Sequence, residues 1–183
     1  AQRESGKVLS VMLSMRTKPI NLKIKELIST NQLGKIRRVH WTATHWFRSQ
    51  AYYASSKWRG TWKGEGGGVL LNQCPHQLDL LAWFFGMPER VTGFCHFGRY
   101  HDIETEDDVT AVFHYPENMK AVFVASTGEV PGTDRLEIVG ELGKLVAENG
   151  QLSFSRNVEE MTAFSRKKES LTSQLECWHI QIP

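Results

Sequence analysis

The second half of this chain is a succession of short segments in which apolar and polar residues alternate, and this pattern restricts the possible fold most. Residues 109–115 and 121–126 show the alternation most clearly. Successive side chains of a strand point to opposite faces of a sheet, so the pattern predicts an open, mainly antiparallel sheet with one covered face. Turn residues separate these two segments from further predicted strands at residues 90–97, 135–139, 144–147 and 151–155.

The first half carries the helical patterns. A short apolar run at residues 8–15 predicts a buried strand. Pro19 then opens a helix that stops before Gly34, with an apolar stripe of Ile20, Ile24, Leu27 and Ile28. Residues 36–47 predict a long strand, residues 48–65 a long loop of the kind that is often functional, and residues 70–85 a second helix. Helices that precede most of the strands favour an α+β fold over repeated βαβ units.

Composition excludes several classes of protein. The chain has 183 residues, enough for one domain with a core, and its 22 basic and 20 acidic residues give a net charge of only +2. This balance argues against a nucleic-acid partner, which usually requires a basic stripe. No apolar run approaches the roughly 20 residues that span a bilayer. The three cysteines form no CxxC pair, which argues against a zinc site and favours a cytoplasmic location.

A glycine run followed by polar residues at helical spacing is the strongest local signal. After Gly66-Gly67-Gly68, the residues Asn72 and His76 lie at i and i+4, and Asp79 follows His76 at i+3. One interpretation is a small polar site; the other is a hydrogen-bonded His–Asp pair that closes a core. Pro75 lies between Asn72 and His76, so the helix either begins at Pro75 or is kinked there.

Two nucleotide-binding motifs are absent, and both ends of the sequence look cut. Neither G-x-G-x-x-G nor G-x-x-x-x-G-K-[ST] occurs, so this chain alone does not predict a nucleotide-binding domain. The polar residues 1–7 lead directly into an apolar run, and residues 177–183 form a strand-like pattern with nothing after it. We therefore expect a fragment of a longer protein.

The glycine-run motif resembles the second-domain signature of the glucose–fructose oxidoreductase / inositol dehydrogenase / MocA family. The resembling run is Gly66-Gly67-Gly68-x-Leu70-x-Asn72-x-x-x-His76-x-x-Asp79-Leu80-x-x-Trp83-x-x-Gly86. Weaker resemblances follow in the order of the family: Leu33-Gly34-Lys35-Ile36, Trp46-Phe47-Arg48, Tyr52-Tyr53, Trp58-Arg59, Glu106-Asp107-Asp108, Leu136-Glu137-Ile138-Val139-Gly140 and Gly143-Lys144-Leu145. Together they cover nearly the whole chain.

The resemblance implies a two-domain enzyme of which this chain is the second part. The fold would be that of a dihydrodipicolinate-reductase-like second domain, with helices on one face of the sheet and the N-terminal Rossmann domain absent. Residues 1–16 would be the tail of that missing domain, and residues 17–183 the domain that binds substrate and builds a homodimer or homotetramer through the open sheet face. NAD or NADP would be bound mainly by the missing domain, with Arg16 as a contact from this chain.

The resemblance also implies site chemistry. His76 matches the family's active-site histidine and is the candidate proton acceptor, while Asn72 stands where aspartate is common and can bind a hydroxyl but cannot take its proton. Asp79 would lie beside the substrate, orienting His76 or capping backbone. Lys18-Pro19 looks like the family's catalytic Lys-Pro pair but follows the last Rossmann strand, so we interpret Lys18 as a solvated helix-start residue.

The long loop supplies candidate substrate contacts. Hydroxyl, guanidinium and aromatic groups there suit sugar rings and acid groups, and the candidates are Arg48, Tyr52, Tyr53, Arg59 and Trp62. The alternative is that they serve packing and surface charge. His96, His101 and His114 with nearby acidic residues match no known ligand spacing, so we expect no metal site.

The sequence thus predicts the substrate-binding and oligomerisation domain of an NAD(P)-dependent dehydrogenase that acts on a hydroxyl of a sugar or polyol. The fragment alone is expected to be inactive. Two alternatives stay open: an NAD-dependent glycoside hydrolase of the same fold, and a non-catalytic sugar-sensing or assembly module. We expect neither a nucleic-acid nor a membrane partner.

Overall fold

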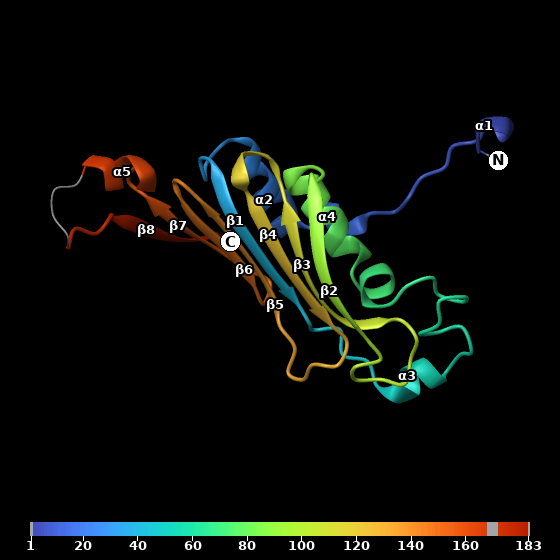
Figure 1. Ribbon diagram of the computed structural model, residues 1–183. Helices are drawn as coiled ribbons and strands as arrows, with labels where there is room; N and C mark the ends of the chain where they lie inside the picture. The colour runs from blue at the N-terminus through green and yellow to red at the C-terminus, as the bar shows by residue number, and fades with distance from the viewer. Residues whose placement is uncertain (1, 168–171, 183) are drawn as a thin grey trace.

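A computed structural model describes residues 2–167 and 172–182, in which eight strands form one twisted sheet (Figure 1). The strands are β1 (Ile36–Ala43), β2 (Arg90–Phe97), β3 (Glu106–His114), β4 (Lys120–Ser126), β5 (Asp134–Gly140), β6 (Gly143–Glu148), β7 (Gln151–Asn157) and β8 (Cys177–Ile182). Their order across the sheet is β2-β3-β4-β1-β5-β6-β7-β8. β1 runs parallel to β4, whereas the other neighbouring strands in the described chain are antiparallel.

The helices are short and lie mainly on one side of the sheet. They are α1 (Gln2–Ser5), α2 (Pro19–Ser29), α3 (Gln50–Ala54), α4 (Pro75–Phe85) and α5 (Met161–Lys167). In Figure 1, α2 and α4 cover one face of the strands, while the opposite face is open. Each of these two helices begins at a proline, which has no N–H to leave unpaired and whose φ suits the first helical turn. The fold is therefore the predicted α+β architecture with helices on one face.

The core lies between the sheet and these two helices. Alternate residues of β1 and β4 point into it, and it is closed by apolar side chains of α2 and α4. Its most buried large members include Ile24, Leu80, Phe123 and Ile138. The predicted alternation of residues 121–126 is thus confirmed, because Ala121, Phe123 and Ala125 are buried and the residues between them are less so.

Three sequence predictions differ from the structure. Residues 8–13 form no strand but an exposed, irregular segment, followed by a 3₁₀ turn at Ser14–Thr17; no sheet edge lies beside them to supply hydrogen bonds. β1 ends at Ala43, four residues earlier than predicted, where the chain turns toward the long loop. The helix predicted over residues 70–85 is two pieces, a π-helical turn at Val69–Gln73 and then α4, because Pro75 cannot donate the helical hydrogen bond.

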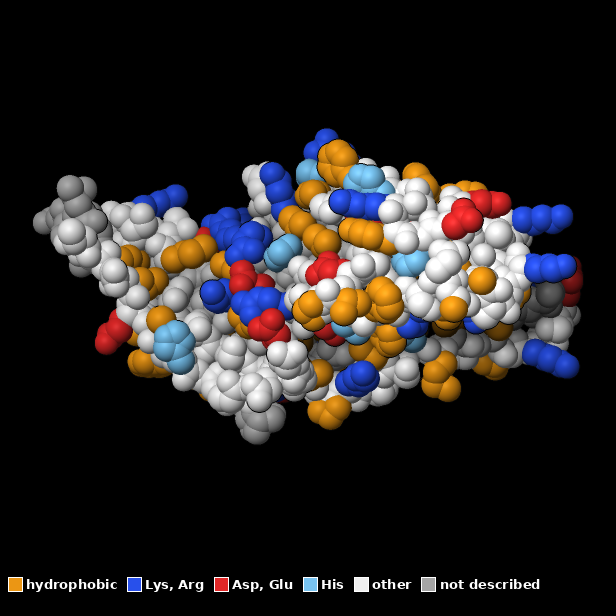
Figure 2. Space-filling view, turned by 90° about the horizontal axis from the view of Figure 1, so that it is seen from below, with side chains coloured by type: hydrophobic (Ala, Val, Ile, Leu, Met, Phe, Trp, Pro, Cys, Tyr) orange, Lys and Arg blue, Asp and Glu red, His pale blue; other side chains and the backbone are white. Residues whose placement is uncertain are grey.

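The end of the sheet that carries α3 and the long loop is chemically mixed. Viewed from below in Figure 2, hydrophobic side chains lie between basic, acidic and histidine side chains, without a uniformly basic area. Among the described residues, no helix is both long and apolar enough to cross a membrane. The chemistry of this loop end therefore depends on individual side chains and not on a broad electrostatic field.

Candidate functional site

The glycine run fixes the position of the site segment by allowing close backbone contact. A Cβ built on Gly68 would lie 1.9 Å from the carbonyl oxygen of Glu106 on β3, so only glycine fits there. The Glu106 side chain reaches the same segment, where its Oε1 accepts a hydrogen bond of 3.3 Å from the Leu70 N–H. The start of the π-helical turn is thereby fixed against β3.

The π-helical turn and the start of α4 present Asn72 and His76. The Cys74 N–H donates to the Val69 carbonyl at 2.9 Å, a five-residue bond of the kind often found at functional sites. The Asn72 side chain has no hydrogen-bond partner among the described residues. His76 is partly buried, and its Nδ1 is buried with no partner in the described chain. The Asn72 amide and the His76 Nδ1 therefore have hydrogen-bonding capacity that the described chain does not use.

Asp79 does not orient His76. Its carboxylate is held by Arg16, whose Nε and Nη2 donate to Oδ2 and Oδ1 at 2.9 and 2.5 Å. Hydrogen bonding to Asp79 raises the pKa of Arg16 further above its ordinary value. The Arg16 guanidinium also lies 5.7 Å from the ring centre of Trp83, one turn further along α4. The core-closing His76–Asp79 pair does not form, and Asp79 connects the incoming chain to α4.

The long loop brings two predicted arginines onto one tyrosine ring. The guanidinium carbons of Arg48 and Arg59 lie 4.9 and 4.2 Å from the ring centre of Tyr52. Arg59 also donates to the Tyr52 hydroxyl at 2.5 Å, and Arg48 donates to Oε1 of Gln73 at 2.8 Å. Since Gln73 Nε2 lies 3.4 Å from the same hydroxyl, four side chains form one continuous network. We refer to it as the Arg48–Gln73–Tyr52–Arg59 network. Its member Gln73 lies three residues before His76 in the sequence.

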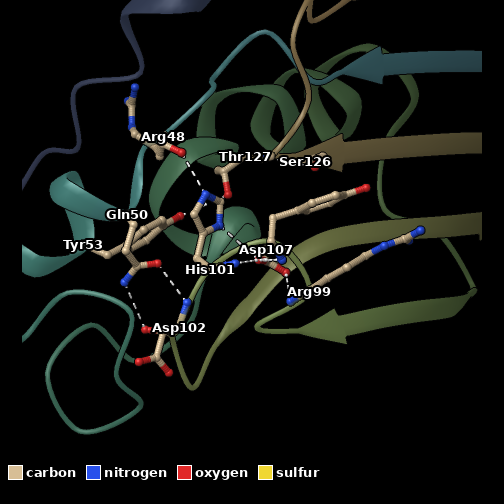
Figure 3. Close-up of polar contacts among 11 residues, drawn as sticks. Arg48, Gln50, Tyr53, Arg99, His101, Asp102, Asp107, Ser126 and Thr127 are labelled. Atoms are coloured by element: carbon tan, nitrogen blue, oxygen red, sulfur yellow. Dashed lines mark hydrogen bonds and ion pairs between the residues drawn. The ribbon is translucent and has the colours of Figure 1, made fainter.

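The backbone of Arg48 is fixed on both sides, as Figure 3 shows. Its N–H donates to the Thr127 carbonyl at 2.8 Å, and its carbonyl accepts from Nε2 of His101 at 2.7 Å. The His101 ring is buried, and its Nδ1 lies 3.0 Å from Oδ2 of Asp107. Asp107 is fully buried and also accepts N–H bonds from Arg99, Tyr100 and His101. The Arg48 side chain points away from this clamp in Figure 3.

The structure places Tyr53 and Trp62 differently from the two arginines. Tyr53 is buried against the His101 ring, its hydroxyl lies 3.0 Å from Oγ1 of Thr127, and burial raises its pKa. That hydroxyl already has a protein partner and supports the clamp. Trp62 is exposed and packs on Phe97 at a ring-centre distance of 6.0 Å. Its backbone N–H donates to Oε2 of Glu104.

The sequence gives no prediction for Gln73, considers His101 only as a metal ligand, and includes Asp107 only in the family resemblance and among the acidic residues near the histidines. Gln73 stands inside the glycine-run motif but gives no signal of its own, because its partner Arg48 is 25 residues away. The described residues contain no group of three or more His, Cys, Asp or Glu arranged to hold a metal ion. Cys74, next to Gln73, is buried, and desolvation raises the pKa of its thiol to about 12, so it is no nucleophile.

Three relatives show what this chain is similar to. Oxidoreductase P35 of Formosa agariphila is 24% identical over 186 residues, which is 100% of this chain and 52% of P35. The WlbA dehydrogenase from Bordetella pertussis, solved in complex with NADH and UDP-GlcNAcA, is 28% identical with a TM-score of 0.73, over 79% of this chain and 44% of its own. Levoglucosan dehydrogenase shares the fold, with a TM-score of 0.71 and 15% identity over 98% of this chain and 48% of its own. These three relatives are named as an oxidoreductase and two dehydrogenases.

The family follows from a profile match that spans most of the fold. The GFO/IDH/MocA C-terminal domain profile matches residues 21–146, from α2 to β6. The chain belongs to this family, as the glycine-run motif predicts. It spans about half the length of the relatives it matches.

Proposed function

We propose that the protein containing this chain is an NAD(P)-dependent dehydrogenase that oxidises a hydroxyl of a sugar or polyol, and that this chain binds the substrate. The observation that carries the proposal is His76, whose buried Nδ1 has no partner in the described chain although the ring lies at the start of α4 in the family's motif. A buried polar atom without a partner costs free energy, which is acceptable where a ligand supplies the missing hydrogen bond.

In this proposal His76 accepts the hydroxyl proton and Asn72 orients the hydroxyl. A neutral imidazole has one nitrogen that can accept a proton, whereas an amide can only exchange hydrogen bonds. The chemistry that a bound nicotinamide supplies is acceptance of hydride from the carbon that carries the hydroxyl. The Arg48–Gln73–Tyr52–Arg59 network and exposed Trp62 bind the rest of the substrate. Asp79 acts indirectly by holding Arg16.

The described residues do not fit a complete dinucleotide site. Gly68 serves close packing on β3, Gly66 and Gly67 lie against Leu71, and Arg16, the predicted cofactor contact, is already bound by Asp79. We therefore assign NAD(P) binding to a domain outside this chain, which the double length of the relatives supports. Val8, Leu9, Val11 and Met12 are 94, 78, 74 and 83% exposed, as expected if residues 1–16 complete that domain.

The substrate class rests on the side chains and on one relative. Guanidinium, amide, hydroxyl and indole groups line the long loop, a mixture that suits polar rings. The WlbA dehydrogenase, 28% identical, is solved with NADH and UDP-GlcNAcA. We further propose a cytoplasmic location, supported by free Cys74, Cys95 and Cys177, and a homo-oligomer formed through the open sheet face.

The test is His76→Ala in the full-length protein, with NADH or NADPH formation measured across a panel of sugars and polyols. Loss of the proton acceptor should lower kcat at least about 100-fold while cofactor affinity changes less than about twofold. His96→Ala, which removes an exposed histidine of β2, is the matched control and should keep turnover. Near-normal turnover of His76→Ala would overturn the assignment.

Asn72 favours one second candidate, a sugar-binding module without catalysis. The position lacks a carboxylate, so no Asp–His proton relay exists between residues 72 and 76. This candidate is favoured if the full-length protein binds NAD(P) tightly but reduces none of it across the whole panel.

A further inference from the structure

Arg48 and Arg59 are two positive charges that the protein leaves without a negative partner. Among the described residues, neither forms an ion pair with a carboxylate. Five other arginines do, namely Arg16, Arg37, Arg38, Arg99 and Arg135. Arg90 and Arg156 also bond to neutral groups, but neither shares an aromatic ring with a second arginine of the described chain. Of the acidic residues nearby, Glu65 accepts the Gly60 N–H at 2.6 Å through Oε2 while its Oε1 is buried without a partner in the described chain, and Glu104 accepts the Trp62 N–H at 3.1 Å. Neither carboxylate forms an ion pair with Arg48 or Arg59 among the described residues. Both guanidinium groups therefore lie against the Tyr52 ring without an ion-pair partner in the described chain.

Much of the hydrogen-bonding capacity of these two arginines is also unused. The Nε atoms of Arg48 and Arg59 are buried and have no partner in the described chain. Arg48 donates to Gln73 Oε1 and to the Phe47 carbonyl, and Arg59 donates to the Tyr52 hydroxyl, although each guanidinium carries five N–H donors. Both side chains are only partly buried, so a ligand can reach their terminal nitrogens. Several N–H donors of each guanidinium, the two Nε–H groups included, are therefore held in place without a protein acceptor in the described chain.

The aromatic surroundings hold these two groups in place. The Arg48 guanidinium also lies over Trp46 at 5.6 Å and that of Arg59 over Trp58 at 4.5 Å, in addition to the shared Tyr52 ring. Stacking of this kind leaves the edge of a guanidinium free for in-plane hydrogen bonds, and that edge matches the geometry of a carboxylate or phosphate. The clamp of His101 on the Arg48 carbonyl fixes one side of the pair.

From these contacts we infer that Arg48 and Arg59 form an anion-binding subsite, and that the substrate is a saccharide bearing a carboxylate or phosphate group. The inference rests on the proposed function, since it names the substrate class of the same site. The anion enters between the two arginines as the counter-charge that the chain itself does not provide. The network through Gln73 then places the bound saccharide next to the segment that carries Asn72 and His76.

The test measures binding to the full-length protein by calorimetry, with glucose, glucuronate and glucose 6-phosphate as probes. At least one anionic probe should bind about 10-fold or more tightly than glucose, because hydrogen bonds between charged groups are the stronger ones. The tighter anion identifies the group as carboxylate or phosphate. Arg59→Gln should remove this preference by weakening the anionic probe far more than glucose, whereas Arg59→Lys, which keeps the charge but not the fork, should retain part of it.

Lys57→Gln is the matched control, because it removes one positive charge from the same loop without touching the network. It should leave the preference unchanged. Equal affinity for all three probes in the wild type, or equal weakening of neutral and anionic probes in Arg59→Gln, overturns the subsite. NAD(P)H formation is measured separately: an anion preference without any turnover refutes the proposed function alone, and turnover without the preference refutes the subsite alone.

Discussion

At Gly68 the polypeptide crosses β3 at a distance that excludes any side chain. The nearest obstacle is a backbone carbonyl, that of Glu106, which cannot rotate away as a flexible side chain could. Because Asn72 and His76 follow within eight residues, the position of both depends on this contact. Gly68 thus serves the site through packing and not through chemistry.

Gly68→Ala should lower the free energy of unfolding by about 2–3 kcal/mol, since the segment must move away from β3 to admit a methyl group. Urea denaturation of the full-length protein measures the change. Gly93→Ala is the control, because a Cβ at Gly93 in β2 meets no atom within 4 Å and the residue has no positive φ. A Gly68→Ala variant as stable as Gly93→Ala would show that the contact is not tight.

At this scale the sequence identifies individual residues but not their partners. The glycine run, Asn72 and His76 are readable from spacing, and the arginines of the loop from their chemistry. Their contacts are not readable, because Arg48 meets Gln73 across 25 residues and Arg16 meets Asp79 across 63. Asp79 looks like a partner of His76 by helical spacing, yet a guanidinium from outside the helix offers two charged hydrogen bonds and takes the carboxylate.

Among the elements, the turn between β5 and β6 is joined to β1 and α5 by a single carboxylate. Glu141 is only 3% exposed; its Oε1 accepts from Arg37 Nε at 2.6 Å and from the Thr162 hydroxyl at 2.7 Å, and its Oε2 accepts the Thr162 N–H at 2.9 Å. Burial alone raises the pKa of Glu141, but the bonds from Thr162 and the Arg37 charge outweigh it, so the net pKa is lowered.

Glu141→Gln should therefore lower the free energy of unfolding by about 1–3 kcal/mol at neutral pH. It should also make the free energy of unfolding less dependent on pH in the acidic range. A carboxylate with a lowered folded pKa stabilises the fold above its unfolded pKa, about 4.3, and this contribution disappears as the pH falls through the folded value. Urea unfolding at a series of pH values from neutral to about 3 should show the wild type losing more stability than the variant. Parallel curves would mean that the Glu141 carboxylate does not titrate differently in the folded state.

Element prediction succeeds where a local pattern determines the structure. The strands from β2 to β7 are all predicted within a few residues, because alternation reflects one covered face. The failures have tertiary causes. The apolar run at residues 8–15 has no neighbouring strand to pair with, and the short helices α3 and α5 lie in segments without clear periodicity.

For the whole molecule, one face of the sheet is left uncovered by α2 and α4 (Figure 1). Val122 and Val124 of β4 alternate with buried residues and so point to this face, and Phe94 of β2, in register with Thr110, is 65% exposed. An apolar strip of this kind on a sheet is a common basis for association with a second copy.

Val124→Arg should therefore dissociate the proposed homo-oligomer, because it places a charge without a partner in the contact. Light scattering of the full-length protein at micromolar concentration would show the mass falling to that of the monomer. Ser29→Arg, at the exposed end of α2, adds the same charge on the helix side and should leave the mass unchanged. An unchanged mass for Val124→Arg would place the contact elsewhere.

The parallel pair at the centre of the sheet also determines when the domain can form during synthesis. β1 lies between β4 and β5, so both of its partners are about 80 to 100 residues further along the chain. The long loop, α4 and the β2–β3 hairpin are synthesised after β1 and before β4 and β5. β1 therefore has no neighbouring strand until β4 and β5 have left the ribosome. Closing so long a loop makes formation of the sheet slow relative to local hairpins. The hairpins β2–β3 and β5–β6 can therefore form early, whereas the pairing of β1 with β4 and β5, which joins the two halves of the sheet, is expected to form last.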